Sequence, residues 1–576
     1  MLKYLADVFC LTSSKESVPK FKFASLKRLI PYVKPHWKKA LFGSLFMIVL
    51  SFLALPPPYL MKLVVDKAFI AKSISVLNIV VIILIGLQLI TVLFSLLTEY
   101  HFNAFSQEIM VKIRKDLFYK ILRLPLSFFD KNQTGYILSR IGEVEGLSFF
   151  FSNTLVRVTT SFFEFIFCLT ILFYLNWQLA VISLLILPIY FFIFKICSRA
   201  FRNLARESFE KGAIIFRQIQ DSLSGVEVIK YFVAEKRESE RIYDHLNEMK
   251  AISIKRNMAS AIVGQFVLLM GSLSGFMILW YSGVNIIKGG FTIGSYVAFA
   301  AYLAKLYGPT QIFANIGLSF QPAVVALDRI SELMDLTGEE ENDKGIIIMK
   351  IKRTIEFHDV SFSYDKKPIL TNISFKINKG EKIVFAGPNG SGKSTIVKLM
   401  LGLYRPQRGS ILFDGYDISQ LSLFSLRDRF SIVSQNTFLF NDTIKNNILY
   451  SRPTAKEDEI EEAARLSGAY EFIKQSDRKF ETQIGERGVR LSGGEKQKIS
   501  IARAILKDSD IIIFDEATSH LDYDSERNII GLIENKFLEK TCVIISHKPL
   551  EYSKIDNTIF LGSGVISRYS TVIAKQ

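Results

Sequence analysis

Lys382-Ile383-Val384-Phe385-Ala386-Gly387-Pro388-Asn389-Gly390-Ser391-Gly392-Lys393-Ser394-Thr395 is the stretch that decides the fold of the C-terminal part of this chain. Its first five residues form an apolar run of strand character, and Gly387–Thr395 fit the pattern G-x-x-x-x-G-K-[ST] between a strand and a helix. The glycines let backbone N–H groups close on phosphates, and the helix N-terminus attracts anions. We therefore expect this loop to bind a nucleotide, with Lys393 on the β- and γ-phosphates and Ser394 on Mg²⁺.

A second buried strand ends in two adjacent carboxylates, in Ile511-Ile512-Ile513-Phe514-Asp515-Glu516. Successive residues of a strand point to opposite faces. We therefore expect Asp515 to face Mg²⁺ and Glu516 to point toward a water at the γ-phosphate. An ordinary strand end with solvated acids is the alternative, and it is less favoured downstream of a phosphate-binding loop.

Short β-branched runs alternate with helical patterns throughout this part of the chain, which indicates an α/β domain with a largely parallel central sheet. The expected strands are Thr354–Phe357, Lys382–Ala386, Ser431–Ser434, Ile511–Asp515 and Cys542–Ser546. An acidic, glycine-bounded stretch at 337–345 precedes them and reads as a connection between domains. We expect a linker at 338–352 and a nucleotide-binding domain at 353–576.

The composition limits what the rest of the chain can be. Its 576 residues are 49% hydrophobic and 22% charged, with four Cys and a net charge of +16. This excludes disorder for the bulk of the chain and a disulfide-stapled scaffold. A mean hydropathy of +0.26 is unusual for a soluble protein. The basic balance leaves a nucleic-acid surface or a membrane protein with basic cytoplasmic segments.

Long charge-free runs in the first 330 residues favour the membrane protein over the nucleic-acid surface. About 20 apolar residues cross a bilayer. Phe165–Phe194 is too long for one span, and Asn176-Trp177-Gln178 divides it into two. The runs that together predict six spans are Ala40–Met61, Ser73–Thr98, Phe165–Phe194, Asn257–Ile287 and Phe291–Leu327, the last interrupted only by Lys305.

The charged segments between these runs predict the orientation. The first forty residues hold nine basic and two acidic side chains, and the basic stretches 101–160 and 198–256 have helical character. By the positive-inside rule all three are cytoplasmic. The loops near 62–72, 176–178 and 288–290 then lie outside. We expect an all-α transmembrane domain at 1–337, in the cytoplasmic (inner) membrane, with the N-terminus and the nucleotide-binding domain in the cytoplasm.

Leu491-Ser492-Gly493-Gly494-Glu495-Lys496-Gln497 resembles the signature of ATP-binding cassette (ABC) ATPases. Further motifs resemble the same family and its exporter branch. They are Tyr364 (adenine stacking), Gln435 (Q-loop), Gly485–Gly488 (X-loop), Ser519–Asp522 (D-loop), His547 (switch histidine), and Leu124–Asp130 and Gly225–Lys230 (intracellular loops). The similarity covers most of the chain. The membrane part comes first and the ATPase part second, which is the arrangement of an exporter half-transporter.

The resemblance implies a dimer with ATP and Mg²⁺ between two ATPase domains. Ser492, Gly493 and Gly494 of one copy are then expected to bind the γ-phosphate held by the other copy, next to Asp522. Glu516 orients or deprotonates the attacking water, supported by His547, while Lys393 neutralises charge. Gln435 completes the Mg²⁺ and water shell. A homodimer is the simplest arrangement, and a heterodimer stays open.

Three positions depart from the family pattern without removing a catalytic group. Glu495 stands where exporters often have Gln, His520 replaces a usual Ala, and Lys548 follows His547 in place of the common Arg. The last two flank the expected dimer interface.

Two ionisable residues within the spans are candidates for substrate contact, because such residues are costly in lipid. Lys305 in the sixth span could meet an anionic substrate, and Glu164 lies in the third. Snorkelling or an interhelical ion pair is the alternative for both. We expect ATP-driven export or flipping of an amphipathic substrate, with a lipid or lipid-linked molecule ranked before hydrophobic drugs or peptides. An ATP-gated membrane regulator is the remaining alternative.

Overall fold

The structure is a computed structural model that describes most of residues 26–571. The stretches outside the described part are 1–25, 133, 152, 186–187, 190–191, 193–203, 205–206, 209–210, 213, 340–344, 365–366, 518–522, 547–554 and 572–576. The chain divides into two compact units, Met1–Tyr119 with Ile137–Asp335, and Lys120–Tyr136 with Leu336–Gln576. The second unit thus includes a short segment from the N-terminal half.

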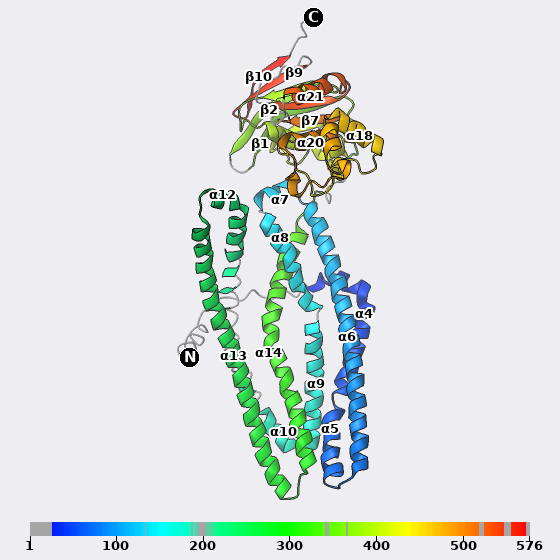
Figure 1. The fold of residues 1–576 in the computed structure, drawn as a ribbon, viewed down its shortest axis with the longest axis vertical. Helices are drawn as coiled ribbons and strands as arrows, with labels where there is room; N and C mark the ends of the chain where they lie inside the picture. Colours follow the sequence, from blue (N-terminus) through cyan, green and yellow to red (C-terminus); the bar gives the residue numbers. More distant parts are fainter. Residues whose placement is uncertain are drawn as a thin grey trace. The chain divides into compact units, whose positions relative to one another are not determined.

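The first unit is helical and carries the predicted spans (Figure 1). Its longest helices are α6 (Ile74–Leu122), α13 (Glu235–Ile287) and α14 (Ile293–Asp335). The other elements are α3 (Ile30–Val33), η2 (Lys34–His36), α4 (Trp37–Leu53), α5 (Pro56–Leu63), η3 (Val64–Phe69), α8 (Thr134–Glu143), η4 (Val144–Phe150), α9 (Asn153–Leu175), α10 (Trp177–Leu184) and α12 (Val226–Tyr231). Helix α14 packs against α9, α5 and α13.

Four helical segments among the described residues are long and apolar enough to cross a membrane: Ile30–Phe69, Ile74–Leu122, Val158–Leu175 and Glu235–Ile287. Ile293–Leu306 is a shorter apolar stretch at the start of α14. Much of the fourth predicted span lies outside the described residues, so the number six stays a prediction.

The connections between the spans agree with the sequence in two places and differ in one. Asn176 separates α9 from α10 and caps α10, because its Oδ1 accepts a hydrogen bond from the Leu179 amide at 3.0 Å. Residues 288–290 turn between α13 and α14. The loop expected near 62–72 is shorter than predicted, since α5 and η3 continue the helix to Phe69 and the chain turns only at 70–72. No glycine or proline follows Pro58 in this segment, so nothing stops the helix earlier.

The second unit contains two sheets. The six-stranded sheet has the order β10-β9-β3-β8-β7-β6, with parallel pairing throughout except between β9 and β10. Its strands are β3 (Lys382–Ala386), β6 (Phe430–Val433), β7 (Ile511–Asp515), β8 (Thr541–Ser546), β9 (Asn557–Gly562) and β10 (Val565–Thr571). This confirms the largely parallel central sheet and places four of the five predicted strands in it; the fifth, Thr354–Phe357, lies in β1 (Thr354–Ser363) of the second sheet.

The second sheet is antiparallel, with the order β2-β1-β4-β5. It consists of β1 (Thr354–Ser363), β2 (Pro368–Asn378), β4 (Arg408–Phe413) and β5 (Tyr416–Asp417). Buried residues of both sheets and of α15 (Lys393–Met400) share one hydrophobic core, which includes Phe357, Phe385 and Leu399. The loops at the end of β3 are therefore held on a rigid support.

Helices complete this unit. They are α7 (Leu126–Lys131), α16 (Leu423–Asp428), α17 (Ile444–Leu449), α18 (Glu457–Leu466), α19 (Tyr470–Gln475), α20 (Gly493–Lys507) and α21 (Tyr523–Asn535), with short turns η6 (Ile418–Gln420), η7 (Lys479–Glu481) and η8 (Glu486–Gly488). Helices α17, α18, α19 and α20 share a separate core that includes Ile448, Ile460 and Ile499.

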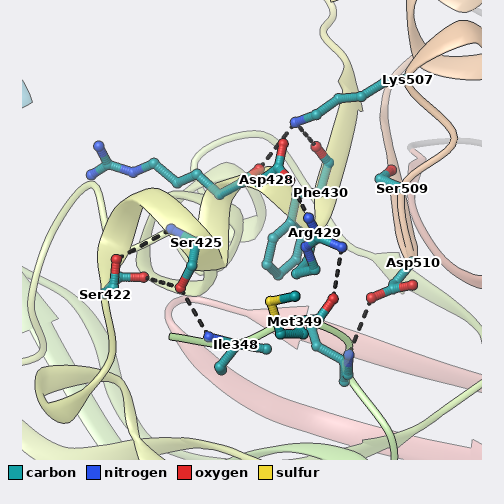
Figure 2. Close-up of polar contacts among 12 residues, drawn as sticks. Ile348, Met349, Ser422, Ser425, Asp428, Arg429, Phe430, Lys507, Ser509 and Asp510 are labelled. Atoms are coloured by element: carbon teal, nitrogen blue, oxygen red, sulfur yellow. Dashed lines mark hydrogen bonds and ion pairs between the residues drawn. The ribbon is translucent and has the colours of Figure 1, made fainter. Parts of the chain in front are cut away.

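Within the second unit, the segment just before β1 is bound by polar contacts to residues near α16 and β7 (Figure 2). The Ile348 amide donates to Ser425 Oγ at 3.0 Å, and the Ile351 amide donates to Asp510 Oδ2 at 3.1 Å. The Arg429 guanidinium donates to the Met349 carbonyl at 2.8 Å. The chain is thus already anchored before the first strand begins.

Candidate functional site

The phosphate-binding loop connects β3 to α15, as its pattern predicts. Gly387 and Gly392 have φ of +146° and +101°, which side chains rarely adopt. A Cβ on Gly387 would lie 2.2 Å from the Leu561 carbonyl oxygen, and one on Gly392 would lie 2.5 Å from Leu370 Cδ2. Both positions therefore require glycine for conformation and for space.

Lys393 at the start of α15 is buried and turned back toward the loop. Its Nζ donates to the carbonyls of Gly387 at 2.8 Å and Pro388 at 3.0 Å. Burial lowers the pKa of Lys393, and the negative charges of Glu516 and Asp515 act in the opposite direction. These contacts hold the ammonium group at the loop, where an anion can replace the carbonyl partners.

The loop also contains a buried polar atom without a protein partner. Ser391 is 2% exposed, and its Oγ has no hydrogen-bond partner among the described residues. Buried hydroxyl groups are nearly always hydrogen-bonded, so an orphan needs a ligand or a water to complete it. Together with Lys393 and the N-terminus of α15, this atom fits a phosphate group.

Asp515 and Glu516 diverge at the end of β7. The Ser394 hydroxyl donates to Asp515 Oδ1 at 3.5 Å, and Gln435 Nε2 donates to Glu516 Oε2. Glu516 has a left-handed backbone, with φ of +51°, and its amide donates to the Ile545 carbonyl at 3.1 Å. A non-glycine residue held in this conformation is strained, and such strain collects at functional sites.

The Ser394 and Asp515 pair is suited to Mg²⁺ rather than to a site built from protein ligands alone. Mg²⁺ is bound in nucleotide sites by one or two protein oxygens, with phosphates and waters completing the octahedron. No group of three or more His, Cys, Asp or Glu that could hold a metal occurs among the described residues. The oxygen donors present therefore fit a metal that arrives with a nucleotide.

Tyr364 follows the end of β1 beside the helix that the loop opens. Its hydroxyl lies 3.4 Å from Thr395 Oγ1, and its ring packs edge-to-face on Tyr404 at 5.1 Å between centroids. Lys398 Nζ lies 5.3 Å from the centroid of the same ring. Tyr364 is 38% exposed, so part of the ring is open to a planar ligand.

The signature stretch forms the N-terminus of α20. Ser492 is the N-cap, and its Oγ accepts a hydrogen bond from the Glu495 amide at 3.3 Å. Glu495 Oε2 in turn accepts from the Ser492 amide at 2.8 Å, which completes a capping box. Ser492 and Gly493 are exposed. Glu495 thus stabilises the helix end at a position where the family often has Gln.

Two expected site residues, Asp522 and His547, lie outside the described residues, as do Ser519, His520, Leu521 and Lys548. The structure brings the others into two groups. Lys393, Ser394, Asp515, Glu516 and Gln435 lie around the phosphate-binding loop, with Tyr364 beside its helix. Ser492, Gly493 and Gly494 lie at the start of α20.

In the membrane unit, Lys305 has a protein partner. Its Nζ donates to the Ala54 carbonyl at 2.5 Å, and Tyr302 one turn earlier on α14 donates to the Leu55 carbonyl at 2.6 Å. Glu164 lies on α9. Both residues remain candidates for substrate contact, and Lys305 also fills a structural position.

The sequence analysis missed two residues that connect the site to other segments. Tyr404 donates a hydrogen bond to the Asp130 carboxylate on α7, and Arg427 pairs with Glu339. Neither lies in a nucleotide-binding motif. Their partners are distant in sequence, so no local pattern could have indicated them.

Family patterns and relatives place the chain among known proteins. Residues 41–310 match the ABC transporter transmembrane region, and residues 370–519 match the ABC transporter domain. A protein of Desulfotalea psychrophila described as an ATP-dependent lipid A-core flippase is 34% identical over 544 residues, which are 94% of this chain and 95% of that protein.

Further relatives carry the same description. The Syntrophus aciditrophicus protein is 31% identical over 96% of this chain and 92% of its own length. The Escherichia coli K12 protein is 33% identical over 89% of this chain and 88% of its own length. Among solved structures, a bacterial Atm1-family ABC exporter with ATP bound matches 93% of this chain and 95% of its own, with a TM-score of 0.83 and 26% identity.

Proposed function

We propose, from the premise that this chain belongs to the ABC transporter family, that it flips an anionic, amphipathic lipid of the lipid A-core class across a bacterial inner membrane. The chain is an ABC exporter in which ATP hydrolysis drives transport. The observation that carries the choice of substrate is the match to lipid A-core flippases, which extends over nearly the full length of both chains.

The chemistry that we assign to the ATPase site is positioning together with electrostatic stabilisation. Gly387–Thr395 hold the phosphates through backbone amides, and Lys393 moves from its carbonyl partners to the β- and γ-phosphates. Mg²⁺, when bound by Ser394 and Asp515, neutralises charge on the phosphate oxygens. Glu516 orients or deprotonates the attacking water, and Gln435, its partner in this structure, keeps that carboxylate in place.

Tyr364 stacks on the adenine through its open ring face. One copy supplies only part of the contacts to the γ-phosphate. The others come from Ser492, Gly493 and Gly494 of a second copy, because the N-terminus of α20 is a second anion site. The family resemblance adds Asp522 and His547 to this interface. We propose a homodimer, since one chain carries both halves of the site, and a heterodimer is the alternative.

The arrangement in the membrane completes the proposal. Six spans at 1–337, a linker at 338–352 and the ATPase domain at 353–576 leave the N-terminus and the ATPase in the cytoplasm. The basic segments before the first span favour this orientation. Closure of the two ATPase domains on ATP turns the central path outward, and hydrolysis releases it.

The test is Glu516→Gln in purified full-length protein. Removing a general base costs about 10²- to 10⁴-fold in turnover, while the phosphate loop still binds ATP. We expect retained ATP binding, hydrolysis reduced by that factor, and no ATP-dependent flipping of fluorescent lipid A-core in proteoliposomes. Glu539→Gln removes an exposed carboxylate in the turn before β8 and should behave as wild type.

Hydrolysis near the wild-type rate in Glu516→Gln would refute the role of Glu516. The substrate assignment has its own criterion in the wild type. ATP-driven movement of drugs or peptides without movement of lipid A-core would contradict it, and so would an ATP-gated passive leak.

A further inference from the structure

The ring of Tyr364, which we expect at the adenine, is held in one orientation by its neighbours. Phe362 packs on it at 5.0 Å between ring centroids and Tyr404 at 5.1 Å, with interplanar angles of 86° and 90°. Aromatic pairs favour such edge-to-face arrangements. The Tyr364 hydroxyl lies 3.4 Å from Thr395 Oγ1 on α15. The ring is therefore fixed both through its packing and through its hydroxyl group.

A cation from the phosphate-loop helix lies over this ring. Lys398 is on α15, and its Nζ is 5.3 Å from the ring centroid of Tyr364 and 5.8 Å from that of Tyr404. A cation within about 6 Å of a ring centroid is attracted by the negative face of the ring. Lys398 is half-buried, so its charge is partly withdrawn from water, which strengthens this attraction.

The remaining part of the Tyr364 ring is open to a ligand. Tyr364 is 38% exposed although it contacts two rings and an ammonium group. Since Lys398 covers one face, a planar base stacks on the other face. The base and the ammonium group then lie on opposite sides of the same ring.

A cation on one face of a ring changes what the other face binds. It draws the π electrons toward itself and so makes the opposite face less negative. An electron-rich base such as adenine is then repelled less and stacks more strongly. Uracil is smaller and poorer in electrons, so it gains less. The ring by itself would accept any base, because every base has a π-face.

We propose that Lys398 sets the base preference of the nucleotide site by acting through the ring of Tyr364. Its ammonium group strengthens the stacking of adenine and favours ATP over UTP. Lys398 is a positioning residue, because it acts on the base through Tyr364 and takes no part in the chemistry at the γ-phosphate. This inference rests on the proposed function, which puts the adenine on Tyr364.

The test compares Lys398→Met with Lys398→Arg in purified full-length protein. Methionine keeps most of the length of the side chain and removes the charge, whereas arginine keeps a cation over the ring. Lys379→Met is the control, because it makes the same substitution at an exposed lysine in the turn between β2 and β3. Tyr364→Ala, alone and together with Lys398→Met, completes a double-mutant cycle.

The binding of three ligands is measured by calorimetry without Mg²⁺, so that hydrolysis does not interfere. ATP and UTP carry a base, and inorganic tripolyphosphate has the same number of phosphates without a base. A general loss of positive charge weakens the binding of all three ligands, whereas an effect through the ring weakens only those that carry a base. ATPase KM and kcat are measured with Mg²⁺, together with the thermal midpoint.

We expect Lys398→Met to raise the Kd of ATP about three-fold, to raise that of UTP less, and to leave that of tripolyphosphate unchanged. The KM for ATP should rise by the same factor, while kcat and the thermal midpoint stay at their wild-type values. Lys398→Arg and Lys379→Met should lie close to wild type. Tyr364→Ala should raise the Kd of ATP about ten-fold or more, and Lys398→Met should add nothing to it.

The outcomes separate this inference from the proposed function. If Tyr364→Ala binds ATP as the wild type does, the adenine is not on this ring and the proposed nucleotide site is contradicted. If Tyr364→Ala weakens ATP binding and Lys398→Met does not, only the role of Lys398 is overturned.

Three further results for Lys398→Met would also overturn that role. Equal weakening of ATP and tripolyphosphate would indicate a general electrostatic effect. A lower thermal midpoint with a lower kcat would indicate a structural one. Tighter binding of ATP would mean that Lys398 covers the face on which the base stacks.

Discussion

Replacing Lys305 by Met tests whether this charge in the membrane unit serves the fold or the substrate. Lys305 Nζ donates to the Ala54 carbonyl at 2.5 Å. In a continuous helix that carbonyl would accept from the amide four residues later, but Pro58 has no N–H. The ammonium group thus supplies the hydrogen bond that the proline removes.

The expected cost follows from this contact. A hydrogen bond to a charged group contributes about 1.5–3 kcal/mol, and an orphaned buried carbonyl carries a penalty of similar size. Met keeps the length of the side chain, so cavity formation adds little. We expect Lys305→Met to lower the free energy of unfolding by about 2 kcal/mol, which is about 30-fold in the unfolding equilibrium at 1.36 kcal/mol per factor of ten.

The assay uses tryptophan fluorescence during SDS titration of full-length protein in mixed micelles. All three Trp residues, at 37, 177 and 280, lie in the membrane unit, so the signal reports this unit alone. Tyr302→Phe removes the neutral hydrogen bond to Leu55 and should cost about 1 kcal/mol. Lys305→Arg keeps a charged donor and should lie close to wild type.

The opposite pattern would refute this reasoning. If Lys305→Met leaves the unfolding midpoint unchanged but raises the lipid concentration for half-maximal ATPase stimulation about ten-fold, a loss of about 1.4 kcal/mol in binding, Lys305 serves the substrate. The structural assignment would then be wrong, and the contact with Ala54 would be a resting partner that the substrate replaces.

Two further predictions concern the ends of helices. Asp66 accepts hydrogen bonds from the Gly294 amide at 2.9 Å and from Thr292 Oγ1 at 2.8 Å at the start of α14. Asp66→Ala should therefore lower the free energy of unfolding by about 0.5–2 kcal/mol in the same fluorescence assay, and an unchanged midpoint would exclude this capping role. Gly392→Ala places a Cβ 2.5 Å from Leu370 at a φ of +101°, so it should cost about 1–3 kcal/mol of stability and weaken ATP binding, as measured by calorimetry. The control is Gly531→Ala on α21, which has open space around it and should be neutral or slightly stabilising. Equal effects of the two substitutions would contradict the argument.

The parallel sheet could be predicted from the sequence because its strands are buried on both faces. β8 is buried at every position, and β3 and β7 at every position but the last. Such strands appear in a sequence as unbroken apolar runs. The phosphate loop at the end of β3 follows from glycine conformation and anion chemistry, which are local properties. Both therefore require no knowledge of distant segments.

Of the antiparallel sheet, only the start of β1 was predicted, at Thr354–Phe357, and the other strands escaped prediction for the same reason in reverse. β2 alternates between buried and exposed positions, and it contains charged and polar residues on its open face. A short run of this type has too little apolar content to stand out from a loop. Its pairing with β1 is set by the core that both strands share with α15, and that core exists only after folding.

The polar contacts across the fold mark the limit of sequence reasoning more sharply. The residues of the pair Asp130 and Tyr404 are 274 positions apart, and those of the pair Ala54 and Lys305 are 251 apart. A lone charge in an apolar run indicates only that some partner must exist, because an unpaired charge is costly there. Which partner it finds depends on the topology, and at Lys305 the partner is a backbone carbonyl, which has no signature of its own in a sequence.

A carbonyl that lacks its helical N–H donor because of a proline nevertheless requires another donor. The run Pro56-Pro57-Pro58 and Lys305 are therefore coupled in stability. A chain that lost the proline run could lose the lysine without penalty, and Pro58→Ala should therefore reduce the cost of Lys305→Met in a double-mutant cycle.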